Sequence, residues 1–211
     1  MQFLLIVMIS YSVPFVVWTI WKKKSSARTF PLIVGMIAYL FISVFRGIAR
    51  AIVLNDSVKE IPWLFYLLSA LLSGIFEEVG RYIVFRWCIP HYDQYRDCVS
   101  YGIGHSVMES FAISHVLEND IYDSFLEAGS FMTGILFSVA MSLLVFVAVH
   151  QLRDKKYLVI AVVMHTIIDI IPALYLCEVI NIGDEMLMEL LYLSGVCYFS
   201  CIVYRHSKNS A

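Results

Sequence analysis

The chain has 211 residues, of which 60% are hydrophobic and only 15% are charged, and its mean hydropathy is +0.78. A soluble domain carries about 25% charged and about 45–50% apolar residues, so the excess of apolar surface is expected to face lipid. The formal net charge of −2, without a basic stripe that alternates with aromatic residues, excludes a nucleic-acid partner. The composition therefore predicts an integral membrane protein in a lipid bilayer.

Apolar runs of about 20 residues, the length that a helix needs to cross the bilayer core, predict an all-α polytopic protein with about seven transmembrane helices. In chain order the predicted spans cover residues 2–21, 30–50, 62–86, 99–116, 129–150, 157–176 and 186–204. We expect the first to be a retained span and not a cleaved signal peptide, because its lysines follow the apolar run. No repeat or long linker divides the chain, which predicts a single transmembrane domain over 1–211 with a catalytic core in about 62–176. The five cysteines include no CxxC pair, so no disulfide framework is expected.

The distribution of Lys and Arg predicts the orientation of the chain. Most of the 15 basic residues fall on alternate connections, namely 22–28, 86–98, 151–156 and the tail after 204. The opposite connections are acidic and contain Glu118, Asp120, Asp123 and Glu127 in one and Glu178, Asp184 and Glu185 in another. The pattern predicts an N-terminus outside and a C-terminus in the cytoplasm, as in a bacterial plasma membrane.

Three of the predicted spans contain ionisable side chains, which are costly in lipid and usually mark function. In each span these residues are three or four positions apart and share a helix face. They are Glu77, Glu78 and Arg81 in the third span, His105 and Glu109 in the fourth, and His165 and Asp169 in the sixth. At 1.5 Å per residue, the three groups lie about 9–14 Å from the cytoplasmic ends of their helices. This common depth predicts one cavity, because single structural ion pairs would not need to share a layer.

These residue types suit hydrolysis in two ways. A buried glutamate such as Glu77 can accept a proton from water, Arg81 can orient a neighbouring carboxylate, and histidines can assist the water or a developing oxyanion. Alternatively, His105, His165, Glu77 and Asp169 could hold a divalent metal such as zinc, which would activate the water instead. Apart from such a metal, no cofactor is expected.

The motifs EEVGR at 77–81, GIGHSVMES at 102–110 and HTIID at 165–169 together resemble the glutamate-type intramembrane proteases of the CAAX-protease and bacteriocin-processing superfamily. The resemblance is nearest to the YhfC-like branch, and the PrsW proteases are relatives. It implies that Glu77 is a general base, Glu78 its neighbouring acid, Arg81 the basic residue of the motif, His105 a water-binding histidine and His165 a histidine on the oxyanion side.

The chain departs from the superfamily pattern at two positions. CAAX proteases space the arginine one residue further along, as EExxxR, and often have Asn where this chain has Asp169. An ionised aspartate is a poor donor to an oxyanion. Proteins of the YhfC-like branch are described as metalloproteases, and Asp169 together with Glu109 favours that chemistry.

The sequence therefore predicts an intramembrane peptidase that cleaves a membrane-embedded or membrane-associated protein or peptide near the cytoplasmic leaflet. Two alternatives stay open: a non-catalytic scaffold or bacteriocin-immunity protein, and a proton-coupled transporter. Two arginines of the second span, Arg46 and Arg50, are expected to extend to the outer interface. His115 and His150 are expected to have ordinary interfacial roles.

Overall fold

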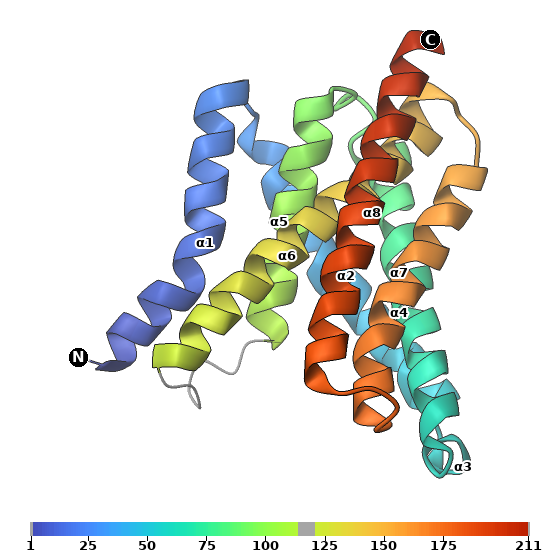
Figure 1. Ribbon diagram of the computed structural model, residues 1–211. Coiled ribbons are helices and arrows are strands. Elements are labelled where there is room, and N and C mark those ends of the chain that lie inside the picture. The colour runs from blue at the N-terminus through green and yellow to red at the C-terminus, as the bar shows by residue number, and fades with distance from the viewer. Residues whose placement is uncertain (1, 114–120, 211) are drawn as a thin grey trace.

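The structure is a computed structural model that describes residues 2–113 and 121–210, with side chains over 12–113 and 129–209. Its described residues are helical and contain no strand (Figure 1). The elements are α1 (Gln2–Ser25), α2 (Thr29–Val53), α3 (Asp56–Lys59), α4 (Pro62–Ile83), α5 (Tyr95–Ile113), α6 (Ile121–Phe146), α7 (Lys156–Leu176) and α8 (Ile182–Ser210), with π-helical turns η1 (Val84–Cys88) and η2 (Val147–Gln151) extending α4 and α6. The predicted all-α membrane fold is confirmed.

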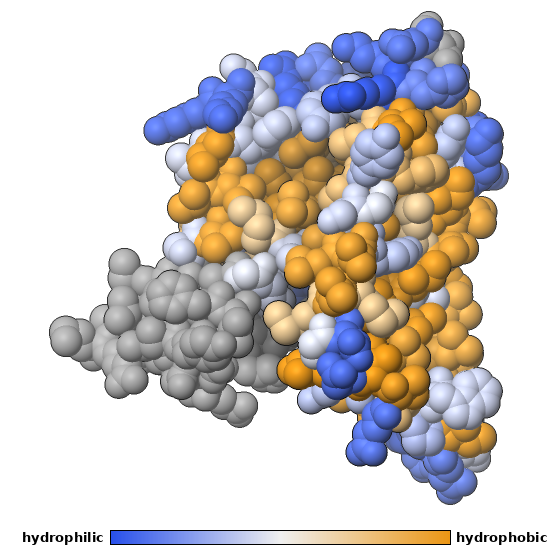
Figure 2. Space-filling view, viewed as in Figure 1, coloured by the Kyte–Doolittle hydropathy of each residue, from blue (hydrophilic) through white to orange (hydrophobic). Residues whose placement is uncertain are grey.

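Five helical segments within the described residues are long and apolar enough to cross a membrane. They are Thr29–Val53, Pro62–Cys88, Gly129–Gln151, Lys156–Leu176 and Ile182–Asn209, and each matches a predicted span. Helices α1 and α5 correspond to the other two predicted spans, so the total of seven stays a prediction. Figure 2 shows an apolar belt between polar ends, as expected for a bundle in a bilayer.

Local sequence explains where several helices begin. Pro62 occupies the first turn of α4, where a missing backbone N–H costs nothing. Asn55 caps α3 by accepting a hydrogen bond from the backbone N–H of Val58 at 3.2 Å. Asn181 caps α8 in the same way through Asp184 at 3.0 Å. The predicted acidic loop was placed over 117–128, but α6 already begins at Ile121 and includes Asp123 and Glu127, while Glu118, Asp120 and His115 lie outside the described residues.

The bundle is arranged around α5 and α4. Helix α5 packs between α2 and α6, α4 packs against α7 and α2, and α8 covers α6 and α7. Because α5 is enclosed by protein, it does not need the apolar surface of a lipid-facing helix. At its N-terminal end, Arg28 donates to Asp97 with 2.7 Å between Nε and Oδ1, which ties the α1–α2 connection to α5 and raises the pKa of the Arg28 guanidinium.

Glycines allow the close approach of α2 to α5. A Cβ atom on Gly35 would lie 2.3 Å from the carbonyl oxygen of Tyr101, and one on Gly104 would lie 2.0 Å from that of Leu32. Both obstacles are backbone atoms, which cannot rotate away as a flexible side chain can. The packing role that the sequence suggested for Gly104 is therefore confirmed, and the contact places α2 directly beside His105.

Gly35→Ala is expected to destabilise the bundle by about 1–3 kcal/mol or more, because the added methyl forces α2 and α5 apart. Gly47→Ala in the same helix is the matched control, since nothing lies within 4 Å of a Cβ there. The control should keep its stability or gain up to about 1 kcal/mol from helix propensity. Unfolding of the purified protein in mixed micelles measures both, and equal behaviour of the two variants would contradict the close helix contact.

Candidate active site

Helix α4 carries a fully buried ion pair at the base of the polar cluster. Arg81 donates through Nη1 to both carboxylate oxygens of Glu78 at 2.6 Å, and through Nη2 to the hydroxyl of Ser138 at 3.3 Å. Adjacent positions on a helix point about 100° apart, so the neighbouring Glu77 faces other partners. The two glutamates therefore occupy different environments although they are consecutive.

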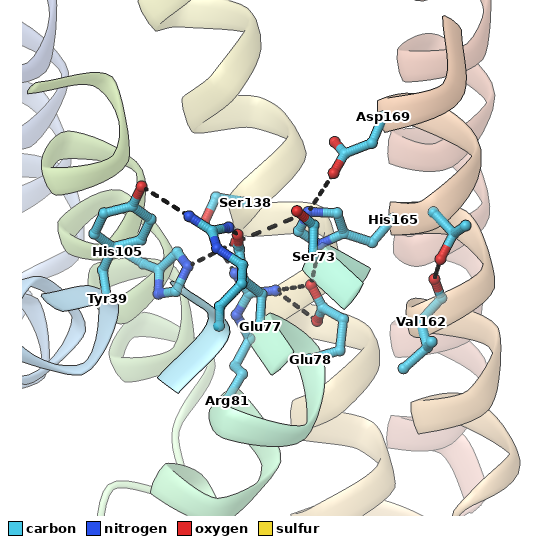
Figure 3. A network of polar contacts seen from close by, with 12 residues as sticks. Tyr39, Ser73, Glu77, Glu78, Arg81, His105, Ser138, Val162, His165 and Asp169 are labelled. Carbon is cyan, nitrogen blue, oxygen red and sulfur yellow. Dashed lines mark hydrogen bonds and ion pairs between the residues drawn. The ribbon is translucent and has the colours of Figure 1, made fainter. Parts of the chain in front are cut away.

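Glu77 is the point where side chains from three other helices meet (Figure 3). Its Oε2 atom lies 3.2 Å from Nε2 of His105 on α5 and 3.8 Å from Nε2 of His165 on α7. Its Oε1 atom forms an ion pair with Arg46 on α2. The predicted convergence of Glu77, His105 and His165 is therefore what the structure has.

Glu78 also holds His165 in place. The Nδ1 atom of His165 lies 2.7 Å from Oε1 of Glu78, while its Nε2 atom faces Oε2 of Glu77 and lies 3.9 Å from Oδ2 of Asp169. A proton on Nδ1, donated to Glu78, leaves the lone pair on Nε2. Histidines that bind metals are oriented by a carboxylate in this manner. Figure 3 shows His165 between Glu78 and Asp169.

Three side chains are arranged so that they could share a metal ion. One ligand atom each from Glu77, His105 and Glu109 lies within 4.8 Å of the other two. The predicted ligand set contained Glu77 and His105 together with His165 and Asp169, so the geometry adds Glu109 to the candidates. The donors are one imidazole nitrogen and carboxylate oxygens in a buried site, which are the groups that bind zinc in hydrolases. The residues present therefore fit a divalent metal.

The site contains residues that the motifs did not identify. Arg46 was expected to extend to the outer interface, but that prediction is wrong: its side chain is only 15% exposed, and it pairs with Glu77. It also donates to the hydroxyl of Tyr39 at 3.4 Å, and the Tyr39 ring contacts the imidazole of His105 edge-on at 5.2 Å between centroids. Arg50 likewise turns inward and donates to the hydroxyl of Ser73 at 2.8 Å.

Side-chain direction explains why these arginines point inward. Cα–Cβ bonds tilt toward the N-terminus of a helix, so a long side chain covers the preceding turn. In α2 that direction leads from Arg46 and Arg50 back toward the middle of the bundle. Reaching the nearer helix end would require the opposite direction.

The chain was compared with known proteins. Residues 9–131 match the family model described as YhfC intramembrane metalloprotease. The chain belongs to this family. The matched segment contains Glu77, Glu78, Arg81, His105 and Glu109, whereas His165 and Asp169 lie beyond it.

The chain is also similar to a curated protein named "Uncharacterized membrane protein YhfC" from Bacillus subtilis (strain 168). The two are 29% identical over 105 residues, which covers 47% of this chain. This chain spans only 40% of that relative's length. No solved structure matches the chain.

Glu78→Gln is expected to lower the free energy of unfolding by about 3–5 kcal/mol, because the Arg81 charge then stays buried without its counter-charge. The double variant Glu78→Leu with Arg81→Met should recover much of that loss. Asp56→Asn removes an exposed ion pair with Lys59 and should leave stability unchanged. Thermal unfolding in detergent measures all three variants. A Glu78→Gln protein as stable as the wild type would show that other groups neutralise Arg81.

Proposed function

We propose that this protein is an intramembrane peptidase that hydrolyses a peptide bond in a membrane-embedded or membrane-associated protein or peptide. The observation that carries the proposal is the meeting of Glu77, His105 and Glu109 inside the helices of a chain from the YhfC family. A cluster of such groups is costly within a membrane and persists where it has a function. The charge pattern supports an N-terminus outside and a C-terminus in the cytoplasm.

Glu77, His105 and Glu109 would hold a divalent cation such as zinc. Such a cation, when bound, acidifies a water molecule and polarises the carbonyl group that it attacks. Net charge also supports cation binding. The cluster contains four carboxylates (Glu77, Glu78, Glu109 and Asp169) against three guanidinium groups (Arg46, Arg50 and Arg81), which leaves one formal negative charge if the histidines are neutral.

The side chains of the chain itself supply proton transfer and orientation. Glu77 is positioned to take a proton from the attacking water, since its Oε2 atom lies between two imidazole nitrogens. The same proton then passes to the leaving amine as the carbon–nitrogen bond breaks. Glu78 does not share this task, because Arg81 and His165 occupy its oxygens; it orients His165 instead.

Packing on one side of the site argues against the transporter alternative. Phe85, Tyr101 and Phe146 are fully buried on the side of the cluster that faces the lysine-rich connections. They belong to the continuous hydrophobic core formed by α4, α5 and α6. A transporter needs polar access from both ends of the bundle, and the described residues provide no polar route through this core.

Glu77→Gln keeps the size of the side chain but removes its basicity, and cleavage should fall about 100-fold or more. Because the substrate is unidentified, the readout is the set of new peptide termini in membranes from cells that express the protein, measured by mass spectrometry. Termini present with wild type and absent with Glu77→Gln are products of the site.

A chelator should also remove these termini, and added zinc should restore them. Arg86→Gln, an exposed substitution outside the cluster, should cleave as wild type does. Identical termini with wild type and Glu77→Gln would contradict a peptidase. Cleavage that survives complete removal of metal would leave Glu77 as the base of a metal-free mechanism.

A further inference from the structure

Exposure rises in one direction across the polar cluster. Glu77 is 1% exposed and His165 is 4% exposed, whereas the side chain of Asp169, one helical turn beyond His165, is 34% exposed. Since Phe85, Tyr101 and Phe146 close the opposite side, the cluster is reached from the end of the bundle where α3 lies. A substrate would therefore enter past the C-terminal part of α2 and the N-terminal part of α4.

Arg50 lies on this approach with unused hydrogen-bond donors. Its Nη2 atom donates to the Ser73 hydroxyl at 2.8 Å and more weakly to the Ser69 carbonyl at 3.4 Å. Its Nε atom is buried and has no partner. No carboxylate among the described residues lies within the 4.0 Å of an ion pair. A guanidinium has five N–H donors, so most of its capacity is free.

An unpaired cation within helices is costly, and this cost favours an anion as its partner. We propose that Arg50, oriented by Ser73, is an anion subsite that holds a carboxylate of the peptide substrate. This inference rests on the proposed peptidase function. The planar fork of guanidinium donors matches the two oxygens of a carboxylate. A lipid phosphate would lie at the interface, whereas Ser73 is buried on the face of α4 that leads to Glu77.

The spacing of the two sites predicts where the substrate carries its charge. Ser73 precedes Glu77 by one helical turn, which is about 6 Å along α4. An extended peptide covers about 3.3 Å per residue, so the carboxylate should lie about two residues from the bond that is cleaved. A free C-terminus at this distance would make the enzyme release a short C-terminal peptide. A Glu or Asp side chain there would instead be a preference within a longer chain.

Equilibrium binding tests the subsite without requiring cleavage. The probes are N-acetyl-Leu-Leu and its C-terminal amide, and N-acetyl-Leu-Glu-amide and N-acetyl-Leu-Gln-amide. Binding to the chelator-treated full chain in neutral detergent is measured by thermophoresis. Wild type should bind at least one acid about tenfold more tightly than its uncharged partner, and the pair that differs identifies the carboxylate. Arg50→Gln should abolish this difference, and Arg86→Gln should keep it.

Several results would overturn the subsite. They are equal binding of acids and amides by wild type, an undiminished preference in Arg50→Gln, or displacement of the acid by phosphatidylglycerol but not by phosphatidylcholine, which would assign Arg50 to lipid. If Arg50→Gln does not fold, Arg50→Lys takes its place, and its preference should fall several-fold because an ammonium lacks the planar fork. Zinc binding at Glu77 should be the same in all Arg50 variants, so failure of the subsite is distinct from failure of the metal site.

Discussion

The buried pair of Glu78 and Arg81 determines how the other groups of the site are arranged. Both side chains are withdrawn from solvent, and each would be costly alone in the middle of the bundle. Because Arg81 satisfies one of the two consecutive glutamates, Glu77 is the one available to partners on other helices. The remaining interaction of Glu78, with Nδ1 of His165, directs the other nitrogen of that ring toward Glu77. One ion pair within α4 thus distinguishes the glutamates and orients a histidine on α7.

A second requirement is the close packing of α2, α5 and α4. Gly35 and Gly104 bring α2 against α5, so that Tyr39 contacts the ring of His105 and Arg46 reaches Glu77. Small residues at such contacts are the usual means of close helix association in membranes, where lipid provides no hydrophobic drive. The site is therefore assembled from side chains on rigid helices, which suits chemistry that needs fixed donors and acceptors.

Hydropathy and spacing predicted much of this arrangement. Each predicted span corresponds to a helix, and the i,i+4 pairs placed Glu77, His105 and His165 at one depth, where they meet. Two features depend on information that a linear pattern lacks. The direction of the Arg46 side chain follows from the N-terminal tilt of helical Cα–Cβ bonds, which charge counting ignores. The grouping of Glu109 with Glu77 and His105 depends on the rotation of α5 against α4, which equal spacings in each helix do not specify.

The central claim is that Glu77, His105 and Glu109 form a metal site, and the most direct measurement is calorimetric titration of zinc into the full chain. Glu109→Gln and Asp169→Asn are a matched pair, since each neutralises one carboxylate a turn beyond a histidine of the cluster. We expect wild type to bind one zinc ion, Glu109→Gln to lose affinity by about 10-fold or more, and Asp169→Asn to stay close to wild type. A wild-type protein that binds no zinc, or a loss of affinity with Asp169→Asn alone, would contradict this account.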